Sequence, residues 1–292
     1  MTERGGDGSV GTDRGDVGSG RDVTGPAIVE PFGAPGAGKT TLAREVLAAL
    51  PDDVAVARPT LAINESLETP RRQLAKLPFV GRGLRAAPTD PLRYAAVAGS
   101  DLRPSLLFNW LYAAGAVDRS ARRPRVTVFD QAIAQAYWSI AVTEPEAVKG
   151  FARRRLAAAI PPVPYVLVCV RASAEVVADR LGARTEPQSR IGAAEPGTPT
   201  VADAVETTET VRTVAADIAA ERPTLFLRTI EADDRVALDA GVKRVVRTVR
   251  REATDGSNPS GRKKSASVTE DGEPVRGGGA TASGDGGTGY PE

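Results

Sequence analysis

The sequence AIVEPFGAPGAGKTTLAREVLAAL, residues 27–50, decides the fold of this chain. It opens with a short apolar run and passes through a glycine-rich turn. It then continues into a segment in which Leu42, Val46 and Leu50 share one face at helical spacing. The stretch therefore predicts a strand, a tight turn and an amphipathic helix in direct succession.

The turn satisfies the pattern G-x-x-x-x-G-K-[ST], which is typical of a phosphate-binding loop, or P-loop. Its glycines let the backbone wrap a phosphate with N–H groups pointing inward, where a Cβ would clash. We expect Lys39 to reach the β- and γ-phosphates of ATP and the Thr40 hydroxyl to coordinate Mg²⁺. The alternative is a glycine-rich turn followed by an exposed lysine, which the strand–loop–helix context disfavours. The predicted nucleotide-binding residues of this loop are Gly33, Gly36, Ala37, Gly38, Lys39, Thr40 and Thr41.

Five short apolar runs rich in Val, Ile and Leu alternate with segments of helical period. This alternation is typical of a parallel sheet covered by helices. It predicts an α/β chain with the three-layer P-loop NTPase fold and a mainly parallel five-stranded sheet. The predicted strands are residues 27–32, 54–58, 125–130, 164–171 and 223–230.

The distribution of residue types divides the chain. Residues 1–25 and 253–292 are rich in Gly, Ser, Thr and Asp, so we expect disordered tails there. Residues 26–252 are predicted to form one kinase-like domain. Within it, 59–124 is too long for one crossover helix and predicts a helical insertion. Residues 185–203 carry three prolines and predict a lid loop.

Composition excludes several chemistries. The chain has no His and one Cys, which rules out imidazole relays, imidazole-bound metals and zinc–cysteine clusters. With 38 basic and 37 acidic residues, it carries no general attraction for nucleic acid. No run reaches the ~18 apolar residues of a membrane span, and the N-terminus does not resemble a signal sequence. The sequence thus predicts a cytoplasmic protein without a membrane or nucleic-acid partner.

The third strand ends in VTVFDQ, which places a carboxylate at its end. A P-loop needs such a group to hold hydrated magnesium, and Asp130 is the candidate; the alternative, N-cap of a following helix, is compatible with that role. Motor and transporter ATPases commonly place a Glu directly after this aspartate to activate water. Gln131 occupies that position here, which speaks against fast hydrolysis and favours transfer of the phosphate to another molecule.

Two arginines lie on the apolar face of the helix predicted from residue 173. On a helical wheel, Arg180 and Arg184 fall within the arc occupied by Val177 and Leu181. Arginine is seldom buried unless it is paired, and its guanidinium matches phosphate oxygens, so an anionic ligand is indicated. The alternatives are snorkelling and pairing with core carboxylates. Arg190, in the predicted lid, is placed to close over the triphosphate. The predicted catalytic residues are Lys39, Asp130, Arg180 and Arg184.

The segments GAPGAGKTT, VFDQ and VCVRASAEVVADRLGART together resemble the P-loop nucleotide kinases, especially the thymidylate-kinase-like and adenylate-kinase-like group. The resemblance spans roughly residues 26–250. It implies that Lys39 and Thr40 bind the triphosphate and Mg²⁺. It also implies that Arg180, Arg184 and Arg190 bind its phosphates.

In one respect the chain departs from this family. Thymidylate kinases typically follow the third strand with an Asp-Arg pair that contacts the acceptor, whereas Asp130 is followed by Gln131.

Two functions follow from these patterns. The first is a kinase that moves the γ-phosphoryl group of Mg-ATP onto a small acceptor bound by the helical insertion. A nucleoside monophosphate suits a chain without His, because its phosphate, with a second pKa of about 6, needs no protein base. A hydroxyl acceptor would need Asp130 as the base. The second function is a regulatory or partner-binding NTPase, and a nucleotide-binding protein without chemistry is a third possibility.

Overall fold

The decisive stretch folds as the sequence predicts. In the computed structural model, β1 (Ala27–Phe32) is completely buried and the glycine-rich turn leads directly into α1 (Lys39–Ala49). Leu42 and Val46 of α1 face the core, as the periodicity requires. The structure describes residues 25–59, 61, 70–86, 88–92, 103–143, 153–183, 191 and 198–255.

The five predicted strands form one sheet in which every pair is parallel. Their order is β2-β3-β1-β4-β5, so β1 lies at the centre. Val29 of β1 is in register with Val128 on one side and Val166 on the other. The α/β prediction is confirmed. The strands are β1, β2 (Val56–Ala57), β3 (Val126–Val128), β4 (Tyr165–Arg171) and β5 (Leu225–Glu231).

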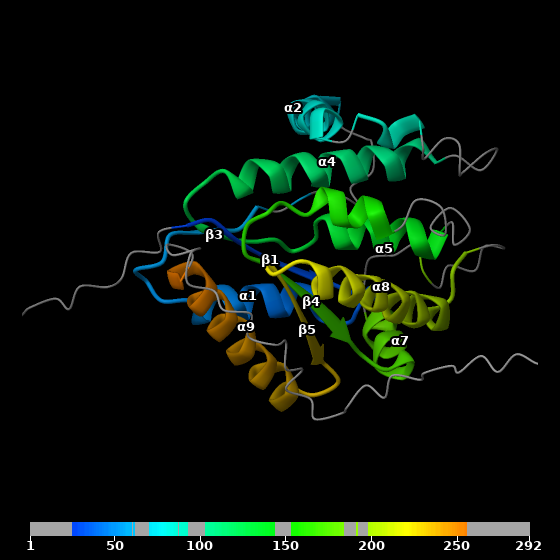
Figure 1. The fold of residues 1–292 in the computed structure, drawn as a ribbon. Coiled ribbons are helices and arrows are strands. Elements are labelled where there is room, and N and C mark those ends of the chain that lie inside the picture. Colours follow the sequence, from blue (N-terminus) through cyan, green and yellow to red (C-terminus); the bar gives the residue numbers. More distant parts are fainter. Residues whose placement is uncertain are drawn as a thin grey trace, which may run out of the picture. The chain divides into compact units, whose positions relative to one another are not determined.

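Helices cover both faces of the sheet and complete three layers (Figure 1). On one face α1 packs beside α9. On the other face α5 lies between α4 and α8, and α2 packs on the outer side of α4. The helices that follow α1 are α2 (Pro70–Ala86), α4 (Pro104–Ala121), α5 (Ile133–Thr143), α7 (Ala174–Gly182), α8 (Val201–Glu221) and α9 (Arg235–Asp255).

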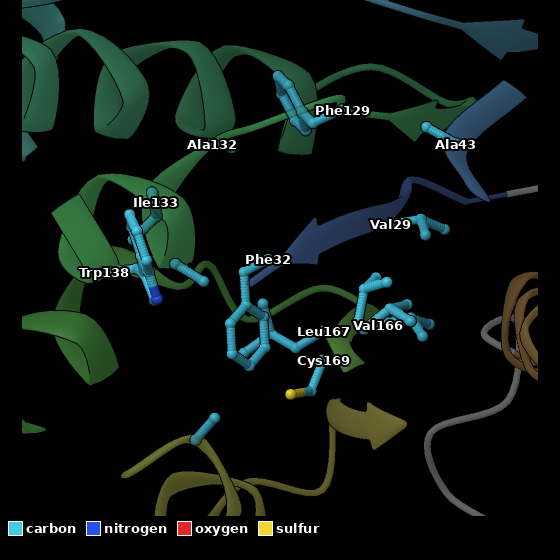
Figure 2. Packing of buried hydrophobic residues seen from close by; sticks show 14 of the residues in the cluster. Val29, Phe32, Ala43, Phe129, Ala132, Ile133, Trp138, Val166, Leu167 and Cys169 are labelled. Carbon is cyan, nitrogen blue, oxygen red and sulfur yellow. The ribbon is translucent and has the colours of Figure 1, made fainter. Parts of the chain in front are cut away.

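The core is built around β1 and β4. Phe32 and Leu167 are fully buried and belong to one apolar cluster with Ile133 of α5 (Figure 2). Cys169 is also fully buried within this cluster, and burial raises the pKa of its thiol to about 12. Apolar packing on both faces therefore explains why these strands are continuous apolar runs.

Proline is unusual in a central strand, yet β1 contains Pro31. The amide of Ala27 donates to Arg125 O on the β3 side, and alternation turns residue 31 to that side as well. The ladder with β3 ends at Val29 and Val128. The position where Pro31 lacks an N–H therefore lies beyond the last residues paired with β3, so the sheet loses little hydrogen bonding there.

Helices α2 and α4, which lie in the chain between β2 and β3, approach each other very closely. A Cβ added to Gly83 of α2 would lie 2.1 Å from Leu111 O, and one added to Gly115 of α4 would lie 1.9 Å from Phe79 O. Each glycine therefore makes room for the backbone of the other helix. α2 and α4 lie within residues 59–124, the range predicted as a helical insertion.

Two predicted boundaries need correction. Helix α8 starts at Val201, so residues 201–203 are helical and not part of a loop. Thr200 and Asp203 form a capping box in which the hydroxyl accepts from Asp203 N at 3.1 Å and the carboxylate accepts from Thr200 N at 2.8 Å. Helix α9 runs to Asp255, past the predicted start of the tail, because Ala253 continues its buried stripe.

Candidate functional site

The P-loop has the backbone conformation that its glycines predict. Gly33, Gly36 and Gly38 have φ values of 147°, 83° and 103°. A Cβ at Gly33 would lie 2.4 Å from Val170 O, and one at Gly36 would lie 3.3 Å from Val177 O. A larger side chain is therefore excluded at Gly33 by conformation and by space, and is disfavoured at Gly36 and Gly38 by conformation.

The N-terminus of α1 is left open to an anion. Gly38 is its N-cap, no side chain caps it, and its first turn carries no acidic residue. The N–H groups of a first helical turn have no partner inside the helix, and the helix dipole favours negative charge there. Ala37, predicted to bind nucleotide, has its N–H turned toward Ala34 O at 3.2 Å. The loop and this helix end, together called the cradle, have the geometry that can bind an anion at a helix N-terminus.

Lys39 lies at the start of this helix and is only 7% exposed. Its ammonium donates to Gly33 O and Ala34 O, each at 2.8 Å, and so lies against the first residues of the loop. Thr40 is exposed and Thr41 is half-buried. The cation and the hydroxyl are thus both carried by the helix end that forms the cradle.

Arg180 of α7 faces the P-loop, in agreement with its place on the apolar arc. Its guanidinium donates to Gly36 O at 3.3 Å and to Ala232 O at 2.7 Å. Through these two bonds, Arg180 connects the P-loop with the residue that follows β5 and holds the loop in position. Arg184 and Arg190 lie outside the described residues.

Asp130 follows β3 and is paired with Arg58, which follows β2. Arg58 Nη2 donates to both carboxylate oxygens at 3.0 and 3.1 Å, and Nε donates to Oδ1 at 3.3 Å. The Asp130 side chain is 14% exposed and that of Arg58 is 35% exposed. The sequence analysis missed Arg58, although parallel neighbouring strands bring the ends of VAVAR and VTVFD to the same edge.

A second carboxylate, Glu30 of β1, lies behind the loop and is completely buried. Its Oε1 accepts from the backbone N–H groups of Ala132 and Gln135, both at 3.1 Å, at the start of α5. The Tyr165 hydroxyl donates to Oε2 at 2.6 Å. Desolvation outweighs these bonds and raises the pKa of Glu30 from 4.5 to about 7.

Gln135 connects this carboxylate to the P-loop. Its backbone N–H donates to Glu30, and its side-chain Oε1 accepts from Gly33 N at 3.1 Å. The first residue of the P-loop is therefore held by the first turn of α5. The sequence contains one signal for this arrangement, a lone Glu in an otherwise apolar strand.

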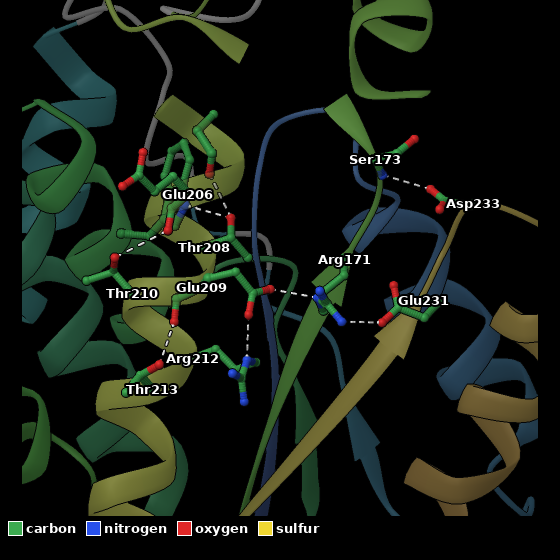
Figure 3. A network of polar contacts seen from close by, with 12 residues as sticks. Arg171, Ser173, Glu206, Thr208, Glu209, Thr210, Arg212, Thr213, Glu231 and Asp233 are labelled. Carbon is green, nitrogen blue, oxygen red and sulfur yellow. Dashed lines mark hydrogen bonds and ion pairs between the residues drawn. The ribbon is translucent and has the colours of Figure 1, made fainter. Parts of the chain in front are cut away.

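A cavity of about 240 Å³ opens beside the P-loop, with Ala34 in its wall. Arg171 lies in this wall between Glu209 and Glu231, each at 2.6 Å (Figure 3). With Asp233, three carboxylates line the cavity against one arginine. That balance disfavours a phosphate in the cavity and suits uncharged hydrogen-bonding groups.

The residues that could hold a metal here are few. Among the described residues, no three or more His, Cys, Asp or Glu side chains are grouped as a metal site. Magnesium at P-loops is held by one hydroxyl, one carboxylate, water and the phosphates, so a large protein cluster is not required. The oxygen donors Thr40 and Asp130 fit that pattern.

No protein-family model matches the chain, and no curated protein matches it. Among solved structures, it is similar to a gluconokinase from Sinorhizobium meliloti 1021, with 16% identity and a TM-score of 0.37. The similarity covers 82% of this chain and 99% of that chain. Within the described parts of the chain, no helix combines the length and apolarity needed to cross a bilayer.

Proposed function

We propose that the chain is a P-loop kinase that transfers the γ-phosphoryl group of ATP to a small acceptor, a nucleoside monophosphate. One observation carries this proposal: three glycines with positive φ lead into an uncapped helix that presents Lys39. The positive φ of these glycines disfavours any side chain there, and at Gly33 a Cβ would also clash, so the shape of the loop is specialised for backbone contacts with an anion.

The residues present fit ATP and Mg²⁺. Lys39 would contact the β- and γ-phosphates, while the Thr40 hydroxyl and the Asp130 carboxylate would hold the metal. When bound, Mg²⁺ would neutralise negative charge that develops on the phosphates during transfer. The acidic cavity beside Ala34 would receive an uncharged part of a substrate, such as a base or a sugar.

The pairing of Asp130 favours a phosphate acceptor over a hydroxyl acceptor. Arg58 fills most of the acceptor positions of this carboxylate and the proposed metal would take what remains, so none is left to receive a proton from a hydroxyl. A nucleoside monophosphate requires no such base, because its phosphate is largely ionised at neutral pH. No arginine follows Asp130 directly in the sequence, but Arg58 places a guanidinium beside it. This guanidinium would contact the acceptor phosphate.

The three arginines predicted near the triphosphate take different parts in this proposal. Arg180 positions the loop through Gly36 and Ala232 and lies next to the cradle. Arg184 and Arg190 follow it in the chain, and their proposed role is to contact the phosphates that the loop holds.

A panel of acceptors with γ-labelled ATP tests the proposal. We expect label on a nucleoside monophosphate and none on nucleosides or sugar acids. The Lys39→Ala variant should lose about 100-fold or more in turnover, as when an essential charge-stabilising donor is removed. Lys243→Ala, at an exposed lysine of α9, is the matched control and should retain full turnover.

Several outcomes would overturn the proposal. Unchanged turnover in the Lys39→Ala variant would show that the P-loop takes no part in the reaction. Acceptor-independent release of phosphate, stimulated by a macromolecule, would identify a regulatory NTPase instead.

The role of Arg58 has a test of its own. Arg58→Ala should raise KM for the acceptor about 10- to 100-fold, as expected for losing a charged hydrogen bond, and leave KM for ATP unchanged. Arg58→Lys should restore part of the loss because it keeps the charge without the fork. An equal rise in both KM values would show that Arg58 acts only on the shape of the site.

A further inference from the structure

A second cavity lies at the outer helical layer, between α2 and the last turn of α4. It has a volume of about 490 Å³, within the range of small-molecule sites. We call it the arginine cavity, and it is lined by Pro78, Phe79, Arg82, Arg119, Arg122 and Arg123.

The arginine cavity is separate from the P-loop site. The end of α4 leads into the amino end of β3, and β3 runs parallel to β1. The P-loop follows the carboxyl end of β1, so it lies at the opposite edge of the sheet. A ligand in the arginine cavity is therefore neither the phosphoryl donor nor the acceptor of the proposed reaction.

The arginine cavity carries an excess of positive charge, and some of its arginine side chains are held by neighbouring groups. Asp118 accepts from Arg122 at 2.8 Å and pairs with Arg82 at 3.5 Å. The guanidinium of Arg119 lies 5.2 Å above the ring of Phe79, in cation–π geometry. For Arg123, no side-chain hydrogen bond or ion pair occurs within the described residues. Four guanidinium groups thus line the cavity, and one carboxylate, Asp118, pairs with two of them.

The helix dipole explains only part of this arrangement. Cations near a helix C-terminus are favourable, which accounts for arginines in the last turn of α4. Arg82, however, belongs to a different helix, about one turn before the end of α2, and lines the same cavity. Like charges brought together by two helices repel one another unless an anion joins them.

We propose that the arginine cavity binds a small polyanion that carries at least two phosphate groups. Guanidinium forks match phosphate oxygens bidentately, and one phosphate alone would leave positive charge uncompensated. The volume of the cavity fits a compact ligand.

Calorimetric titration of the full chain with inorganic tripolyphosphate tests this site. The titration uses Lys39→Ala as the background, to weaken binding at the P-loop. Adding Arg119→Ala and Arg123→Ala should weaken tripolyphosphate binding at least 10-fold. Adding Arg154→Ala and Arg247→Ala, two exposed arginines elsewhere, changes the net charge equally and should change affinity less than twofold.

Two further titrations test how many phosphate groups the site needs and how far lysine can replace arginine there. Orthophosphate should bind at least 10-fold more weakly than tripolyphosphate. Arg119→Lys with Arg123→Lys should retain part of the binding, which also shows that the fold is intact. Equal affinity in the cavity variant and its charge control would overturn the proposal. So would binding confined to anionic vesicles or to long RNA.

Discussion

Replacement of Glu30 by Gln should remove a pH dependence from the stability of the domain. Glu30 is completely buried in β1, and its pKa is raised from 4.5 to about 7. At about 1.4 kcal/mol for each pH unit, this difference corresponds to about 3 kcal/mol. Glutamine has the same shape and can accept from the amides of α5, but it does not ionise.

The sign follows from proton binding. Between pH 4.5 and 7 the folded chain keeps the Glu30 proton while the unfolded chain has lost it, so raising the pH favours unfolding. The full contribution is present below pH 4.5 and is lost as the pH rises through about 7. Relative to Glu30→Gln, the wild type should therefore lose about 3 kcal/mol of unfolding free energy across this window.

Urea denaturation of both proteins at several pH values measures the difference, and subtraction cancels the contribution of other titrating groups. Tyr165→Phe adds a second check. It removes a hydrogen bond that lowers the pKa of Glu30, so the loss should extend to higher pH. Parallel pH profiles for wild type and Glu30→Gln would refute the assignment of a buried, titrating carboxylate.

Four further substitutions probe backbone space and the P-loop. Gly33→Ala places a Cβ 2.4 Å from Val170 O at a φ of 147°, and should cost about 1–3 kcal/mol in urea unfolding and impair ATP binding. Gly115→Ala places a Cβ 1.9 Å from a carbonyl oxygen of α2 and should also cost about 1–3 kcal/mol. Gly81→Ala, in open space on α2, should instead gain up to about 1 kcal/mol, and a loss at Gly81 would contradict the steric argument. Gln135→Leu leaves Gly33 N–H without its acceptor, so unfolding free energy should fall by about 1–3 kcal/mol and KM for ATP should rise; an unchanged KM would contradict the coupling.

The strands and the P-loop were predictable because their signals are local. Continuous apolar runs indicate strands buried on both faces, and the glycine pattern of residues 33–38 states the backbone conformation almost directly. The helical wheel also placed Arg180 on the correct side of α7, where its guanidinium meets the loop. Its partners were not predictable, because they are backbone oxygens brought there by the P-loop and the end of β5.

The pairing of Arg58 with Asp130 depends on which strands are neighbours. Strand order is a property of the whole sheet, and β2 and β3 are separated in the chain by 59–124. Sequence spacing alone does not reveal that their ends meet. The start of α8 was missed for a different reason, since the prolines before Thr200 obscured a capping box that was present in the sequence.

Glu30 shows how a residue that weakens a strand can organise a site. A buried carboxylate costs desolvation, yet this one satisfies two N–H groups at the start of α5 that would otherwise lack partners. α5 in turn presents Gln135 to Gly33, where the P-loop departs from β1. The strand that carries the loop therefore also fixes, through a neighbouring helix, the angle at which the loop leaves it. An apolar residue at position 30 would remove the desolvation cost but leave the helix end and the first P-loop residue without that support.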